Sequence, residues 1–300
     1  MSKKKIKLTK KKILTVAGLL LLAVLTVLAY VFRGFIEVWM ETGKVNDQSS
    51  AIQDLYDDGE PASGPEGDPE AEIPVNSRFR ALLGQNEDTI GWLEIEGIDI
   101  GLPVVQRDNS YYLKHDFYGE ESSHGTLFLS RYNTADPNDP EYPDDCLIVF
   151  GHNMLDGTMF SNMTKYRKAE FVSASPFLSF DTLWEDADYV IVAVFVANTL
   201  EEQGEPFLYN TMRRFDTGEE KQAFIDAVME RSLITANVDV GTDDTFVMLS
   251  TCDYEFTGER LVAVARRLRD DETRESFSGY AAAENPDPLM PDIWNELYKK

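Results

Sequence analysis

The residues from Ile13 to Phe32 form an uncharged run of twenty amino acids, rich in Leu, Val and Ala, and this run restricts the fold more than any other feature of the chain. At a helical rise of about 1.5 Å per residue, a run of this length spans about 30 Å, which is the hydrocarbon thickness of a bilayer. We therefore predict a transmembrane helix over residues 13–32.

The charges that flank this run predict its orientation. Residues 1–12 contain seven lysines, and no acidic residue occurs before Glu37. Basic flanks stay in the cytoplasm, so the N-terminus is expected inside the cell and the bulk of the chain outside. A cleaved signal peptide is the alternative, but it needs a shorter apolar core and a better cleavage site than the sequence after Ala29 offers. An uncleaved signal-anchor is favoured.

The charge balance and the cysteine content exclude several classes of protein. The 300 residues include 28 basic and 53 acidic side chains, a net charge of −25. Such a chain repels a phosphate backbone, so nucleic acid is not expected as a partner. Two cysteines make neither a disulfide framework nor a zinc-ligand pattern, and no cofactor or metal is expected.

Residues 33–75 are expected to join the membrane helix to a folded domain. A juxtamembrane helix could continue to about Trp39. The stretch from Asp54 to Glu72 then holds eight acids, three prolines, three glycines and no Lys or Arg. This composition cannot bury a core, so we predict a disordered acidic spacer, with a specific binding role as the alternative. The domain is accordingly expected to fold without the residues before Pro74.

Residues 76–269 have the pattern of a mainly β domain with α additions. A short helix is expected over 76–83, and an amphipathic helix over 219–232, between the sixth and seventh strands. Eight short runs rich in β-branched and aromatic residues are bounded by turn residues: 89–95, 100–105, 125–130, 146–150, 177–183, 189–197, 245–252 and 260–268. Eight strands with irregular connections predict a closed or nearly closed β-barrel. Residues 270–300 are interpreted as a C-terminal tail or surface strap.

Three residues carry a pattern that fits thiol chemistry. A cysteine nucleophile acts as a thiolate, needs an acid–base partner such as His, and needs a donor for the oxyanion that forms on the attacked carbonyl. Cys252 ends one predicted strand and Arg260 begins the next, so a hairpin with a seven-residue loop would place them opposite each other. His152 follows another predicted strand, after a glycine that permits a tight exit.

On these residues the sequence resembles the sortases, and specifically class B. The family's motifs are present in the family's order: Gly151-His152-Asn153-Met154, Leu249-Ser250-Thr251-Cys252, and a strand that begins at Arg260. The run Gly157-Thr-Met-Phe160 and the helix before the seventh strand are further class B traits. The resemblance covers residues 81–268 and implies an eight-stranded sortase-type barrel.

The resemblance also implies an activity, a set of partners and a location. Cys252 would attack the carbonyl carbon of a Thr in the C-terminal sorting signal of a secreted protein and form a thioester. An amine of a peptidoglycan precursor or cross-bridge would then resolve the thioester. His152 would act as acid and base, and Arg260 would hold the oxyanion or the substrate backbone. The protein would be a cysteine transpeptidase of a Gram-positive-type bacterium, anchored in the cell membrane through residues 13–32 with an extracellular catalytic domain.

Four neighbouring residues have less defined expectations. Ser250, Thr251 and Asn153 are expected to contact the substrate or the oxyanion. Asp253 either orients the imidazole of His152 or only caps the turn that follows the nucleophile.

The remaining cysteine and histidines match no motif. Cys146 is expected to be a buried thiol, with a disulfide to Cys252 as an alternative that would block the nucleophile. His115 and His124 lie in turn-rich sequence, and surface roles are expected for both.

Two other functions are compatible with the same motifs. A pilin-polymerising sortase would use a Lys amine of another subunit in place of a cell-wall amine. A non-catalytic surface binding module could keep the sortase fold, but the complete set of Cys252, His152 and Arg260 argues against it. The sorting motif and the amine donor depend on loops around the groove that these motifs do not place.

Overall fold

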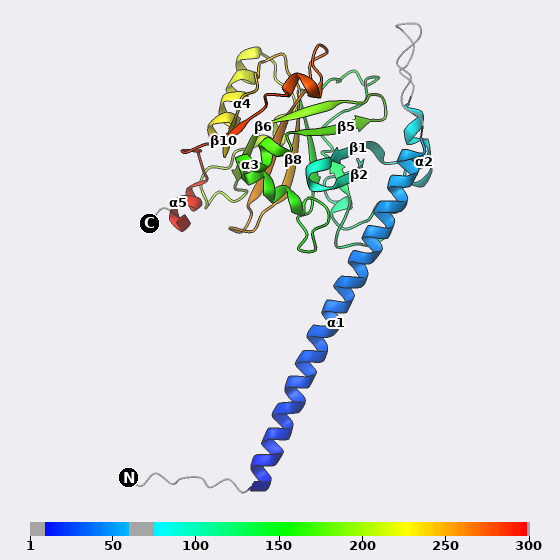
Figure 1. The fold of residues 1–300 in the computed structure, drawn as a ribbon, viewed down its shortest axis with the longest axis vertical. Coiled ribbons are helices and arrows are strands. Elements are labelled where there is room, and N and C mark those ends of the chain that lie inside the picture. Colours follow the sequence, from blue (N-terminus) through cyan, green and yellow to red (C-terminus); the bar gives the residue numbers. More distant parts are fainter. Residues whose placement is uncertain (1–9, 60–74, 299–300) are drawn as a thin grey trace. The chain divides into compact units, whose positions relative to one another are not determined.

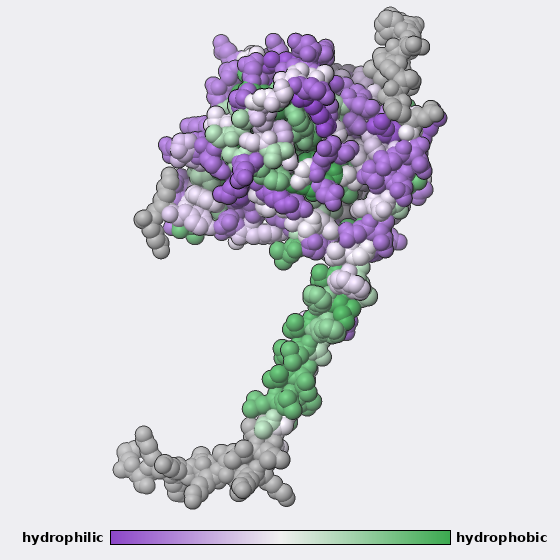
Figure 2. All heavy atoms as spheres, viewed as in Figure 1, coloured by the Kyte–Doolittle hydropathy of each residue, from purple (hydrophilic) through white to green (hydrophobic). Residues whose placement is uncertain are grey.

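The computed structural model describes residues 10–59 and 75–298, and the chain divides into two compact units, Met1–Gln48 and Ser49–Lys300. The first unit consists of the larger part of helix α1 (Lys10–Asp57). Its large apolar side chains from Leu19 to Met40 are exposed, and Figure 2 shows them as a continuous hydrophobic surface. Within the described residues, one helical stretch, Ala17–Asp57, is long and apolar enough to cross a membrane, and it contains an 18-residue window with a mean hydropathy of 2.3. The helix predicted over residues 13–32 is therefore present.

The C-terminal end of α1 corrects the predicted spacer. The helix does not stop near Trp39 but continues to Asp57. Ile52 and Tyr56, four residues apart on one helix face, are 4% and 5% exposed and belong to a core cluster of the second unit. The average composition of the stretch from Asp54 to Glu72 hid the apolar contact of Tyr56, and Ile52 lies just before that stretch. The predicted spacer over residues 60–72 lies outside the described residues.

The second unit contains the predicted eight-stranded closed barrel, whose strands β1, β2, β5, β6 and β8 are labelled in Figure 1. The eight strands are β1 (Thr89–Ile95), β2 (Ile100–Val105), β3 (Leu127–Leu129), β4 (Cys146–Gly151), β5 (Phe177–Thr182), β6 (Asp188–Ala197), β8 (Phe246–Cys252) and β9 (Arg260–Arg267). Their order around the barrel is β1-β2-β3-β4-β8-β9-β6-β5. The β2–β3 and β4–β8 pairs are parallel and the other pairs are antiparallel. Every predicted strand is confirmed, with ends shifted by two residues at most.

Helices and two short strands complete the second unit. The α-helices are α2 (Arg80–Gln85), α3 (Ala169–Ala174), α4 (Gly218–Arg231) and α5 (Asp292–Tyr298). The 3₁₀ helices are η1 (Ser77–Phe79), η2 (Glu96–Ile98), η3 (Tyr111–Leu113), η4 (Ser161–Arg167), η5 (Tyr209–Thr211) and η6 (Arg274–Phe277). Both predicted helices of this unit are therefore present, as η1 with α2 and as α4.

The C-terminal segment packs on the domain as a strap. Strand β10 (Ala282–Glu284) pairs with β7 (Ile234–Ala236), which follows α4. Met290 is buried, and the Tyr280 hydroxyl donates to the Ile191 carbonyl of β6 at 2.9 Å. Of the two interpretations of residues 270–300, the strap describes this segment.

Strand β6 shows how the barrel wall is buried on both faces. Its residues alternate between a cluster inside the barrel, which includes Ile191 and Val194, and a cluster on the outer face, which includes Val190 and Phe195. A β-bulge between Ile191 and Ala193 shifts the pairing with β9. Helix α4 covers the outer face with three buried apolar side chains, Phe224, Ile225 and Val228. The neighbouring strands β8 and β9 follow the same two-sided pattern.

Candidate active site

The strand registers bring the three expected chemical residues to one end of the sheet. Cys252 and Arg260 are direct partners in the antiparallel β8–β9 pair, and Gly151 of β4 pairs with Thr251 in the parallel β4–β8 pair. His152 directly follows Gly151. Inward-facing residues such as Leu249 alternate with outward-facing ones, so Cys252 and Arg260 both point to the outer face of the barrel wall.

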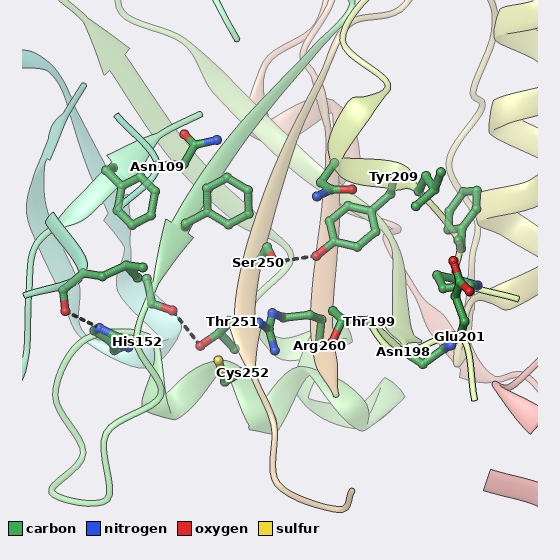
Figure 3. Close-up of a pocket in the computed structure, with 18 residues that line it drawn as sticks. Asn109, His152, Asn198, Thr199, Glu201, Tyr209, Ser250, Thr251, Cys252 and Arg260 are labelled. Carbon is green, nitrogen blue, oxygen red and sulfur yellow. Dashed lines mark hydrogen bonds between the residues drawn. The ribbon is translucent and has the colours of Figure 1, made fainter. Parts of the chain in front are cut away.

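These side chains line a groove of about 470 Å³. In Figure 3, Cys252 lies between His152 and Arg260. The groove wall is partly apolar, and Phe128, Phe150, Phe207 and Leu208 contribute to it. Its polar lining includes Asn109, Asn198, Thr199, Glu201, Tyr209, Asn210, Ser250 and Thr251. A groove with this mixed lining can bind a peptide, with apolar contacts for affinity and a few polar groups for orientation.

One nitrogen of the His152 imidazole is hydrogen-bonded to the backbone of Leu113. Its Nε2 lies 2.8 Å from the carbonyl oxygen of Leu113. A carbonyl only accepts, so Nε2 carries a hydrogen, and Nδ1 is the nitrogen that gains or loses a proton. Gly125 permits this arrangement: it has φ +62°, and a Cβ there would lie 2.3 Å from the Tyr112 carbonyl and 3.3 Å from Cδ2 of His152.

His124 corrects the expectation of a surface role. It is 2% exposed, and its Nε2 lies 2.7 Å from Oδ2 of Asp156. Asp156 belongs to the loop that follows His152, and its other oxygen accepts from the Thr158 hydroxyl at 2.7 Å. His124 thus ties the segment before β3 to the loop that carries His152. The sequence contains no signal for this pair, because its members lie 32 residues apart.

Hydrogen bonds between neighbouring chain segments hold the backbone around Cys252. The Asn153 amide donates to the Cys252 carbonyl at 3.0 Å, and the Thr251 hydroxyl donates to the Gly151 carbonyl at 2.8 Å. Asn153 is buried and is not among the groove-lining residues, and its side chain contacts the backbone of Cys252. The expected contact of Asn153 with the substrate stays a prediction. Thr251 lines the groove, but its hydroxyl is engaged in this bond.

Ser250 makes a contact that the sequence did not predict. Its hydroxyl lies 2.8 Å from the hydroxyl of Tyr209, which belongs to η5, and Figure 3 shows this pair across the groove from His152. Burial raises the pKa of Tyr209, so the phenol stays protonated. The pair therefore provides neutral hydroxyl groups beside the apolar wall of the groove.

Asp253 is engaged away from the imidazole of His152. Its carboxylate lies 2.7 Å from Arg167, and its other oxygen accepts from the Tyr254 amide at 2.9 Å. Of the two alternatives for this residue, the contacts are those of a turn residue. Arg167 also pairs with Glu259, and it was missed because it lies at the end of η4, far away in sequence.

The Cys146 thiol is fully buried. Cys146 is the first residue of β4, whereas His152 follows the last residue of that strand. It pairs in register with Phe246, the first residue of β8, whereas Cys252 is the last. Both cysteines are free, so the alternative of a disulfide between them is wrong. Burial raises the pKa of the Cys146 thiol, which keeps it protonated and unreactive.

Comparisons with known proteins agree with this geometry. Sortase B of Listeria monocytogenes is 32% identical over 182 residues, which cover 60% of this chain and 69% of that protein. Sortase B of Staphylococcus aureus is 25% identical over 264 residues, which cover 86% of this chain and 98% of that protein. No protein-family model matches the chain.

Solved structures show the same fold. The crystal structure of sortase B from Bacillus anthracis in complex with AAEK1 has a TM-score of 0.64 at 27% identity and covers 77% of this chain and 99% of that one. Sortase B of Clostridium perfringens has a TM-score of 0.55 at 29% identity, with coverage of 63% and 98%. The barrel and the groove define a sortase-type cysteine transpeptidase fold. The chain belongs to the class B sortase family.

Proposed function

We propose that the protein is a membrane-anchored class B sortase that cleaves a C-terminal sorting signal after Thr and transfers the secreted protein to a cell-wall amine. The observation that carries this proposal is the register that pairs Cys252 with Arg260 and places His152 at the end of the adjacent strand, all in one groove. A nucleophile, an acid–base group and an oxyanion donor are then within one site.

The proposed reaction has two steps. The Cys252 thiolate attacks the carbonyl carbon of the Thr, and the carbonyl oxygen becomes an oxyanion. The amide bond breaks, a thioester forms, and the leaving amine takes a proton from His152. The incoming amine then attacks the thioester, gives a proton to His152 and releases the thiolate, so the catalyst is regenerated.

Arg260 is proposed to stabilise the oxyanion. One Nη of its guanidinium donates to the Glu259 carbonyl at 2.9 Å, and this bond anchors the side chain. Its other N–H groups can donate to a substrate bound in the groove. A guanidinium offers five donors in a fixed plane and stays charged at all working pH values. It thus suits a site where negative charge develops on an oxygen next to the sulfur.

The membrane helix and the lysine block support a single-pass topology with a cytoplasmic N-terminus. In this orientation the barrel unit lies outside the cell, where secreted proteins and peptidoglycan precursors are found. Protease added to wall-stripped cells is expected to digest the barrel unit, and its protection would contradict the orientation.

A panel of candidate sorting-signal peptides tests the activity. Purified protein is incubated with peptides that contain Thr at the cleavage position, with and without an amine acceptor, and the products are identified by mass spectrometry. Cleavage after Thr that disappears in folded Cys252→Ala and persists in Cys146→Ser is the expected result. Turnover by folded Cys252→Ala would overturn the assignment, and a Lys-bearing pilin fragment as the preferred acceptor would replace wall anchoring by polymerisation.

A further inference from the structure

One arginine outside the groove joins the two strand ends that carry Cys252 and Arg260. Arg167 contacts Asp253, the residue after the cysteine, and Glu259, the residue before the arginine. Its Nε donates to Asp253 at 2.9 Å, and its Nη2 lies 2.7 Å from the same carboxylate and 2.5 Å from Glu259. A single guanidinium therefore holds both ends of the loop between β8 and β9.

The buried charge of Glu259 makes this contact obligatory for the loop. The Glu259 side chain is fully buried, and those of Asp253 and Arg167 are 12% and 19% exposed. Burial raises the pKa of Glu259, and the positive charge of Arg167 opposes that rise. A buried carboxylate without a partner is costly, so the loop keeps this conformation only while Arg167 compensates it.

The same loop is connected to the segment that follows His152. Glu259 accepts from the Glu255 amide at 2.8 Å inside the loop. The Tyr254 hydroxyl donates to the Asn153 carbonyl at 2.8 Å. A displacement of the loop would therefore reach the neighbours of Cys252, Arg260 and His152 together.

The C-terminal strap covers Arg167 from the outside. The guanidinium lies 5.7 Å from the centre of the Trp294 ring, and the Tyr298 hydroxyl donates to Glu255 of the same loop. Both residues belong to α5. Both η4 and the strap therefore contact this loop, and Arg167 lies at the centre of these contacts.

We propose that Arg167 is a positioning residue for transpeptidation, which acts through Asp253 and Glu259 and fixes the separation of Cys252 and Arg260. The proposal rests on the proposed function. The oxyanion donor must lie within hydrogen-bond reach of an oxygen next to the sulfur, and a misplacement of about 1 Å costs about 100-fold in rate. Arg167 does not line the groove, so substrate binding is independent of it.

The test compares two variants of the full chain in detergent micelles, with a sorting-signal peptide as substrate. Arg167→Lys keeps a positive charge beside Glu259 but loses the planar fork. We expect an unfolding temperature close to that of the wild type, a kcat lower by about 100-fold and an unchanged KM. The second variant combines Arg167→Met, Asp253→Asn and Glu259→Gln, so that no buried charge is left unpaired, and the same loss in kcat is expected.

Arg269 offers a matched control at the opposite ends of the same two strands. It follows β9 and pairs with Asp244 at 2.8 Å and Asp239 at 3.1 Å, so it also bridges two carboxylates. Arg269→Lys is expected to leave kcat and KM unchanged. If Arg269→Lys lowers kcat as much as Arg167→Lys does, the loss reflects any weakened bridge of this kind, and the positioning role of Arg167 is overturned.

Each outcome has a defined meaning. A wild-type kcat in either folded Arg167 variant overturns the positioning role and leaves the proposed function intact. A rise in KM at constant kcat overturns it as well, because that result assigns Arg167 to substrate binding. Absence of Cys252-dependent turnover in the wild type overturns the proposed function and this inference with it.

Discussion

Cys252 and Arg260 are direct cross-strand partners at the end of β8 and the start of β9. Directly opposed residues of an antiparallel pair lie about 4.5–5.5 Å apart at Cα, and their side chains point to the same face. The strand ladder therefore sets the register that brings the sulfur and the guanidinium to the same face, and the contacts of Arg167 hold the two strand ends at which they lie. This arrangement suits a site that must provide a positive charge beside the developing oxyanion.

The first prediction concerns Arg260. Arg260→Lys keeps the charge but loses the planar array of donors, so we expect a folded protein with a turnover lower by about 100- to 1000-fold, the usual cost of losing an oxyanion donor. Thermal unfolding and peptide kinetics on the same preparation provide the measurement. A lower unfolding temperature with near-normal turnover would assign Arg260 a structural role and leave Cys252 and His152 as the reactive pair.

The second prediction concerns Gly125, which lies against the imidazole of His152. In Gly125→Ala the new Cβ would clash with the Tyr112 carbonyl and press on the His152 ring. We expect a large loss of kcat in the protein that remains folded, measured by peptide cleavage. Gly119→Ala is the control, because Gly119 also has a positive φ, of +78°, but its Cβ would meet only the Tyr111 hydroxyl at 3.4 Å. Equal activity in the two variants would show that the contact with His152 is unimportant.

The third prediction replaces the expectation that the domain folds fully without the residues before Pro74. The Tyr56 ring stacks on Trp92 at 4.4 Å, and its hydroxyl donates to Asp181 at 2.6 Å. A soluble form that starts at Ser49 is therefore expected to be more stable than one that starts at Val75, by about 3 kcal/mol, which is the usual cost of removing a buried aromatic side chain.

Urea unfolding of the two soluble forms provides the measurement. Tyr56→Ala in the longer form should reproduce most of the difference. Tyr56→Phe should cost less, about 2 kcal/mol, because it removes the hydrogen bonds of the hydroxyl to Asp181 and from Arg78 but keeps the stacked ring. If the long and short forms have the same free energy of unfolding, the end of α1 does not stabilise the domain and acts only as a linker.

The barrel and the cross-strand pairing of Cys252 with Arg260 could be predicted because both depend on local sequence. Runs rich in β-branched and aromatic residues and bounded by turn residues define the strands, and a short loop between two strands dictates which residues face each other. Cys252 and Arg260 are such a pair. His152 followed from a motif at the end of a third strand, and the resemblance to sortases connected it with the other two.

The supporting residues could not be predicted, because their roles arise from contacts between distant segments. Arg167 lies 86 residues before Asp253, and His124 lies 32 residues before Asp156. No local pattern distinguishes such an arginine or histidine from one on the surface. Tyr56 was missed for another reason: its neighbours are acidic, and a composition average over the whole stretch concealed one apolar helix face.

The fourth prediction concerns pH and Asp181. Burial raises the pKa of this carboxyl to about 6, although hydrogen bonds from Tyr56 and Ala187 and the charge of Arg78 oppose the rise. In the unfolded chain an Asp has a pKa of about 3.9. Between these two values the native state binds more protons than the unfolded state, so the stability that Asp181 contributes falls as the pH rises from about 4 to about 6 and is constant above that range.

Asp181→Asn removes this titration, and the comparison of the two proteins isolates it. The free energy of unfolding of the wild type minus that of the variant should fall by on the order of 2 kcal/mol between about pH 4 and pH 6.5. Asp244→Asn is the control, because the pKa of Asp244 is shifted in the opposite direction from that of Asp181. Although burial raises its pKa, the hydrogen bonds from Arg269 and Gly241 outweigh burial and leave it lowered, so the stability it contributes is present at higher pH and lost on acidification. Urea unfolding of the soluble form from Ser49 at several pH values measures both differences, and a difference for Asp181→Asn that is flat or rises with pH would refute the prediction.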